Sequence, residues 1–188
     1  MTTAAIIIGI IYCLALTSSI VPWAVGLEPA EESTLSRRFL VSLIFAVTQA
    51  LMAFLGYLIG SLIGYMFGDL MRYVTFAMMM VVAVKMIIDA MKVLKAKHLY
   101  SFTSNWGFLL LGIISGMNTL LLGVCSEGYM PFGHWFFLAI AVAGFFWAWH
   151  SIKVVYIPNM LKATSFIEFS GAVFLIVIAI LYLFTDLV

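Results

Sequence analysis

Charged residues are scarce in this chain. Only 9% of its 188 residues are Asp, Glu, Lys or Arg, and 65% are hydrophobic, whereas soluble domains contain about 25% charged and about 45–50% apolar residues. This composition excludes a soluble fold and indicates an integral membrane protein, because apolar spans of about 20 residues account for nearly the whole chain. With a net charge of +1 and no long basic run, we expect no nucleic-acid partner.

The sequence also lacks the motifs of common enzymes. It contains no H-E-x-x-H, no G-x-S-x-G, no phosphate-binding loop and no CxxC sequence, so we expect it not to be an enzyme. Its two cysteines, Cys13 and Cys125, both lie in apolar surroundings. We expect them to be free thiols.

Long apolar runs with few charges predict six transmembrane helices. The six runs cover residues 1–27, 39–68, 70–91, 107–125, 134–155 and 165–184. A helix satisfies its backbone hydrogen bonds within the span, and the alternating strands of about 10 residues that a barrel needs are absent from the pattern. The predicted fold class is therefore an all-α membrane protein. The first run has no basic residue before its apolar part and is too long for a cleaved signal peptide.

Basic residues collect on one side of the predicted bundle. The first, third and fifth loops and their flanks carry seven of them: Arg37, Arg38, Lys92, Lys95, Lys97, Lys153 and Lys162. The opposite side carries Arg72 alone. Because basic loops stay in the cytoplasm, this pattern predicts that both termini face away from it.

The chain divides into two halves of three spans each. We expect a single transmembrane domain over residues 1–188, with a first half at about 1–93, a basic cytoplasmic loop at about 94–106 and a second half at about 107–188. An odd number of crossings inverts the second half relative to the first, which predicts a 3+3 inverted repeat. Transporters built from such repeats bind their substrate near the bilayer midplane, between the halves.

Several polar side chains fall near this midplane. At a rise of about 1.5 Å per residue, Asn118 and Gln49 lie near the centres of the fourth and second spans, and Thr17 and Ser18 lie in the first. Two interpretations stay open. The side chains could form hydrogen bonds between helices, each of which stabilises the bundle by about 0.6 kcal/mol on average. Alternatively, they could line a polar cavity, since polar residues inside a membrane usually have a function. Pro22 is expected to kink or end the first helix.

Four segments, taken in order, resemble one family of exporters. They are SLIFAVTQALMAFLGYLIGSLIG from Ser42, VAVKMIIDAMK from Val82, SGMNTLLLGV from Ser115 and FIEFSGAVFLIVIAIL from Phe166. Through them the chain is similar to the bacterial manganese efflux pumps of the MntP type, within the LysE-like exporter superfamily. The resemblance implies a multi-pass protein of the bacterial inner membrane that exports a divalent cation with acidic residues inside the bundle.

At the central positions this sequence departs from the family pattern. The family has an aspartate where Asn118 stands, a glutamate where Gln49 stands and an aspartate in the first span, where this chain has no acid. An amide oxygen can coordinate a hard cation but cannot neutralise its charge. We therefore predict a divergent, manganese-type cation exporter with a neutral substrate site at Asn118, Gln49, Thr17 and Ser18.

The remaining charges near the predicted spans are few. Lys85 and Asp89 are four residues apart on one helix face, so they can form a structural ion pair, and the resemblance implies a basic and an acidic residue at these positions. It also implies an acid at Glu168. Alternatively, Asp89 and Glu168 together could hold a metal ion in an inner vestibule.

A repeat of small residues marks one face of the second span. Gly56, Gly60 and Gly64 recur every four residues. This spacing lets a neighbouring helix backbone approach closely, so we expect the three glycines to have a packing role.

Two function classes stay open. The first is a transporter of a small ion or solute, which the amides favour, because loss of function alone would tolerate Leu or Ala at Asn118 and Gln49. The second is a non-transporting membrane subunit of a larger complex that retains the exporter fold. In both cases we expect the lipid bilayer as surroundings, a homo-oligomer or a membrane complex as alternative assemblies, and no cofactor apart from a transported metal ion.

Overall fold

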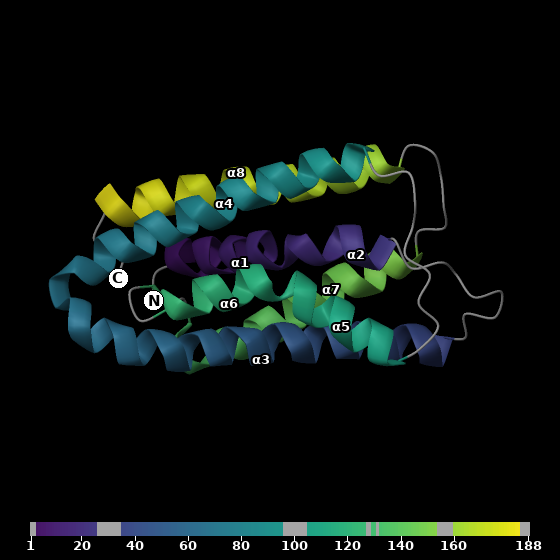
Figure 1. The fold of residues 1–188 in the computed structure, drawn as a ribbon, viewed down its shortest axis with the longest axis horizontal. Helices are drawn as coiled ribbons and strands as arrows, with labels where there is room; N and C mark the ends of the chain where they lie inside the picture. Colours follow the sequence, from purple (N-terminus) through teal and green to yellow (C-terminus); the bar gives the residue numbers. More distant parts are fainter. Residues whose placement is uncertain are drawn as a thin grey trace.

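A computed structural model describes residues 3–25, 35–95, 105–126, 129–130, 132–153 and 160–184, and its regular elements in these ranges are all helices (Figure 1). In chain order they are α1 (Thr3–Thr17), η1 (Ser18–Ile20), α2 (Val21–Val25), α3 (Leu35–Phe67), η2 (Gly68–Leu70), α4 (Met71–Lys95), α5 (Asn105–Ser115), α6 (Met117–Val124), η3 (Gly133–Trp135), α7 (Phe136–Lys153) and α8 (Met160–Phe184). Five helices are long and apolar enough to cross a membrane, and the bent pair α5 and α6 makes a sixth span. The prediction of an all-α membrane protein is confirmed.

The helices run side by side along the long axis of the molecule (Figure 1). The start of α1 and the end of α8 lie at one end of the bundle, and the starts of α3, α5 and α8 lie at the other. Arg37, Arg38 and Lys162 are in the first turns of α3 and α8, and Lys153 ends α7. Among the described residues, Arg37, Arg38, Lys153 and Lys162 therefore lie at the end of the bundle opposite to Arg72, the second residue of α4.

Apolar side chains cover both the inside and the outside of the bundle. Tyr12, Leu16, Met79, Met86 and Phe136 are completely buried in the main core. Large apolar residues are exposed along the outer faces, as at Leu62, Met66, Val142, Phe166 and Phe184. An apolar outer surface of this extent suits contact with lipid and is far larger than the patches on soluble monomers.

The helices of two spans are not regular along their whole length. The first passes through the 3-10 turn η1 at Ser18–Ile20, which ends two residues before Pro22. Proline lacks an N–H group, and its ring crowds the carbonyl four residues earlier. The fourth bends by 43° between α5 and α6, at the Ser115–Gly116 pair, and Gly/Ser pairs are common sites of helix kinks. The effect of Pro22 was expected from the sequence, whereas the bend in the fourth span was not.

Close backbone contact joins α3 to α6. A Cβ atom added at Gly56 would overlap the carbonyl oxygen of Leu120, and one added at Gly60 would overlap that of Val124. Gly64 lies one turn further along α3 and is partly exposed. The first two glycines therefore let α6 lie directly on α3, which positions the bend in the fourth span.

Candidate functional site

The bend between α5 and α6 is closely packed against α3. Its backbone hydrogen bonds continue through the bend, since the Gly116 N–H donates to the Gly112 carbonyl and the Leu120 N–H donates to the Gly116 carbonyl, both at 2.9 Å. A Cβ atom at Gly116 would lie 2.8 Å from Cγ of Met52 on α3. A side chain at Gly116 would therefore push the bend away from α3.

Gln49 of α3 binds both sides of this bend. Its side chain is completely buried, and its Nε2 atom donates to Ser115 Oγ at 3.0 Å. Its Oε1 atom accepts a short hydrogen bond from Thr119 Oγ1. Because both ends of the amide are occupied by residues of the bend, Gln49 fixes the bend in place and has little capacity left for a substrate.

The two interrupted spans meet each other. The Ser19 hydroxyl of η1 lies 3.3 Å from the Ser115 carbonyl oxygen at the end of α5. Four residues before η1 begins, the Trp147 indole of α7 donates to the Leu14 carbonyl of α1 at 2.9 Å. Helix α7 thus supports the interruption in the first span as α3 supports the one in the fourth.

Thr17 and Ser18 form hydrogen bonds within their own helix. Thr17 Oγ1 donates to the Cys13 carbonyl and Ser18 Oγ donates to the Ala15 carbonyl, both at 2.7 Å. Ser18 also packs closely against Gly171 of α8. Both hydroxyls are buried near the centre of the bundle, as expected, but these bonds link them neither to Asn118 nor to Gln49.

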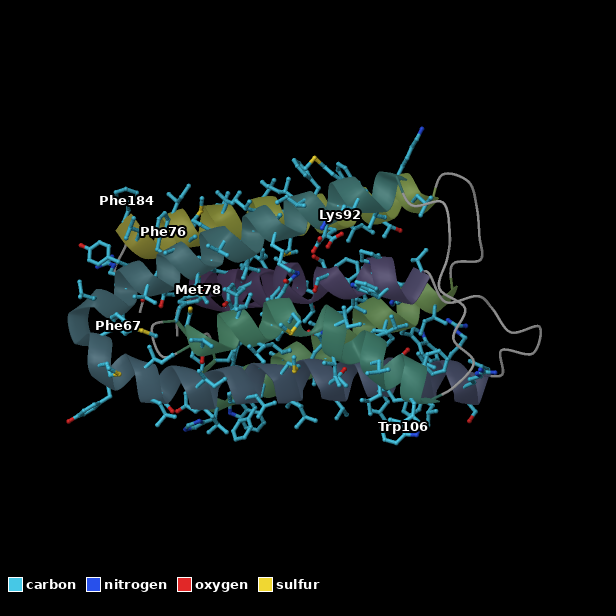
Figure 2. All side chains as sticks on the ribbon, viewed as in Figure 1. Phe67, Phe76, Met78, Lys92, Trp106 and Phe184 are labelled. Atoms are coloured by element: carbon cyan, nitrogen blue, oxygen red, sulfur yellow. The ribbon has the colours of Figure 1, made fainter. Side chains whose placement is uncertain are left out.

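Asn118 points to a different group of residues, on α4. The Lys85 Nζ atom donates to Asn118 Oδ1 at 2.7 Å and to Asp89 Oδ2 at 3.2 Å. Asp89 also accepts from Lys92 at 3.2 Å, and Figure 2 labels Lys92 near the end of α4 that leads to Lys95. The structure therefore separates the two central amides, with Gln49 in a structural cluster and Asn118 in a charged one.

Glu168 of α8 belongs to the charged group. It is 3% exposed, and its Oε2 atom is buried with no hydrogen-bond partner. The charges of Asp89 and Lys85 both act on its carboxyl group, and Ser165, one turn earlier, binds the Ala90 carbonyl of α4 at 2.7 Å. A buried carboxylate oxygen without a donor is unfavourable, so this side chain is a candidate ligand for a cation.

The chain matches the model of a known protein family. The family model described as "Putative manganese efflux pump" (Mntp) matches residues 32–183. The chain belongs to this family. The resemblance seen in the sequence is thereby confirmed, and the description of the family is that of a membrane transporter for a metal ion. No curated protein and no solved structure matches.

The matched range contains most of the candidate site of this MntP-family chain. It includes Gln49, Lys85, Asp89, Asn118 and Glu168, whereas Thr17 and Ser18 lie before it. Among the described residues, no three His, Cys, Asp or Glu side chains are grouped as a metal site. A cation near Asp89 and Glu168 would therefore need the Asn118 amide oxygen or water as further ligands.

Sequence reasoning missed several members of the site. The contact between Lys85 and Asn118 joins residues on different helices, 33 positions apart, which no local spacing reveals. Ser115 and Thr119 were also missed as partners of Gln49. The Ser-Gly pair at the middle of an apolar run was the available signal for the bend.

A cavity of about 640 Å³ lies elsewhere, between α1, η3 and α7. Its lining is apolar and includes Ile10, Leu14, Trp135, Val142 and Phe146. None of the candidate site residues lines it. Asn118 and Glu168 are instead closed off from solvent, at 2% and 3% exposure.

Proposed function

We propose that this protein exports a divalent cation of the manganese type through a site formed by Asn118, Asp89 and Glu168. The observation that carries the proposal is the position of Asn118. The side chain is buried directly after the bend in the fourth span, and it shares the Lys85 ammonium with the acidic residue Asp89 on α4. Transporters often bind ions at interrupted helices, because the interruption exposes polar groups inside the membrane.

The chemistry of the three side chains suits such an ion. Carboxylate and amide oxygens are the ligands that Mn²⁺ prefers in proteins. The amide at Asn118 carries no charge, but Asp89 and Glu168 can together offset two positive charges. The neutral site expected from Asn118 and Gln49 is thus revised in the proposal, in which Gln49 supports the bend and the acids come from α4 and α8.

Features consistent with the predicted 3+3 inverted repeat support the same site. The first helix of each proposed half is interrupted, and Ser19 joins the two interruptions. The main helix contacts follow the same symmetry, since α3 packs on α7, α4 packs on α8, and α1 packs on α7 as α5 packs on α3. In this arrangement the two halves, residues 1–93 and 107–188, surround the site near the bilayer midplane.

Access to the site is suggested from the basic end of the bundle. The side chain of Asp89 is 33% exposed, whereas Asn118 and Glu168 are almost completely buried. Asp89 lies in the half of α4 that leads to Lys95. If the basic end faces the cytoplasm of a bacterial inner membrane, an ion would meet Asp89 first and would reach Asn118 after a rearrangement.

One observation favours the alternative, a membrane subunit that does not transport. The Asn118 oxygen is occupied by Lys85, so the described conformation has no vacant ligand there. Uptake of Mn²⁺ into everted membrane vesicles separates the two functions. Vesicles with the wild type should accumulate Mn²⁺, those with Asn118→Leu should not, and those with Ser61→Ala, a change at an exposed hydroxyl of α3, should match the wild type. No uptake above empty vesicles by the wild type would leave the subunit as the better reading.

A further inference from the structure

We infer that Lys85 is a built-in competitor of the transported cation. Its ammonium group donates to the Asn118 oxygen, and an incoming cation must displace it. This inference rests on the proposed function above. It assigns Lys85, which the sequence indicated as part of a structural ion pair, a role in setting the affinity of the site.

The geometry places the ammonium where a cation would bind. Lys85 Nζ is 2.7 Å from Asn118 Oδ1 and 3.2 Å from Asp89 Oδ2, so it contacts two of the three proposed ligand side chains. An ammonium group has three donors and no acceptor. The two oxygens therefore already hold a positive charge in the described state.

The charge balance makes displacement necessary. Four charged side chains form this group, positive at Lys85 and Lys92 and negative at Asp89 and Glu168, so their formal sum is zero. A dication that entered beside the ammonium would raise the sum to +2 around the buried Glu168 and Asn118 side chains. Departure of the Lys85 ammonium lowers that sum and frees the Asn118 oxygen.

The side chain can move without unfolding its surroundings. Lys85 is 44% exposed, and a lysine has a flexible four-carbon stem that can carry its charge toward the membrane surface. Lys92 binds Asp89 at the same distance of 3.2 Å, but its side chain is 72% exposed. Lys92 is therefore a matched control, an ammonium on the same carboxylate with much greater access to water.

Binding of Mn²⁺ to the purified, detergent-solubilised protein tests the inference, with free Mn²⁺ followed by electron paramagnetic resonance. Removal of a positive charge about 4 Å from a bound cation should tighten binding at least about tenfold. Lys85→Gln should therefore bind Mn²⁺ at least about tenfold more tightly than the wild type. Lys92→Gln should change the Kd less than about threefold because solvent screens its charge. Lys85→Arg keeps the charge and should resemble the wild type.

The outcomes separate this inference from the proposed function. If the wild type transports Mn²⁺ but Lys85→Gln binds it no more tightly than Lys92→Gln, the competitor role is wrong and the export function stands. If Lys85→Gln binds Mn²⁺ tightly and the wild type transports none, Lys85 does occupy the site and export by the wild type is wrong. Should Lys85→Gln fail to fold, Lys85→Met supplies the same test without the charge, and unchanged affinity in that variant would equally overturn the inference.

Discussion

Ser19 and Ser115, which are 96 positions apart, connect the two interrupted spans through a hydrogen bond of 3.3 Å from the Ser19 hydroxyl to the Ser115 carbonyl oxygen. Ser115 also accepts from Gln49 through its own hydroxyl. The interruption in the first span, the bend in the fourth and the middle of α3 are thus joined by two adjacent hydrogen bonds. If one of these helices moves at this point, it must either break these hydrogen bonds or move the other two helices with it.

Replacement of Gln49 by leucine should weaken this connection. The change leaves Ser115 and Thr119 without a partner on α3, and interhelical hydrogen bonds in membranes contribute about 0.6 kcal/mol on average and up to about 1.7 kcal/mol. We expect Gln49→Leu to lower the thermal unfolding temperature in detergent and to reduce transport. Thr48→Val is the control, because Thr48 Oγ1 bonds only to carbonyl groups of its own helix, Ile44 and Phe45, among the bonds of the described residues. A loss of stability in Thr48→Val as large as in Gln49→Leu would contradict the special role of Gln49.

Substitution of Gly60 should separate α3 from α6. A side chain at this position would overlap the Val124 backbone, and overpacking of this kind costs about 1–3 kcal/mol. We expect Gly60→Val to unfold at a clearly lower temperature than the wild type, whereas Leu58→Ala, on an outward-facing position of α3, should have a small effect. Equal unfolding temperatures for Gly60→Val and the wild type would show that α6 does not lie on α3 in the membrane protein.

Neutralisation of Glu168 should separate stability from function. Glu168 Oε2 is buried without a hydrogen-bond partner, so a charge there costs desolvation free energy. Removal of the charge removes this cost and should leave the unfolding temperature unchanged or higher. Loss of a ligand carboxylate should nevertheless lower Mn²⁺ transport at least about tenfold, given that even outer groups of metal sites affect affinity about 10- to 100-fold. Glu168→Gln and the charge-preserving Glu168→Asp can be compared by unfolding and by vesicle uptake. Full transport by Glu168→Gln would exclude this side chain as a ligand.

The overall fold could be predicted because each span is a long apolar run, and the solvent dictates a helix for such runs. The site was only partly predictable. Depth along a helix identified Asn118 and Gln49 as polar residues near the midplane, and the resemblance identified Glu168, but depth does not give the direction in which a side chain points. Rotation of the helices about their own axes decided that Gln49 faces Ser115 while Asn118 faces Lys85, and this rotation depends on tertiary packing.

The orientation of the bundle is open to a direct test. The basic side chains at the starts of α3 and α8 predict that this end faces the cytoplasm and that the end of α8 faces away from it. Alkaline phosphatase fused after residue 188 should therefore be active, and a green fluorescent protein fused at the same point should be dark. The opposite pair of results would reverse the orientation. The ion would then reach Asp89 from the side away from the cytoplasm, contrary to the proposal.

Transport by the purified protein tests the central claim most directly. Proteoliposomes containing the wild type, Asn118→Leu or Asp89→Asn can be compared for accumulation of radioactive Mn²⁺ along an imposed Mn²⁺ gradient. We predict saturable accumulation by the wild type and a loss of at least about tenfold in both variants, since each removes a ligand oxygen or a compensating charge. Accumulation by Asn118→Leu and Asp89→Asn at the rate of the wild type would contradict a cation site at this position.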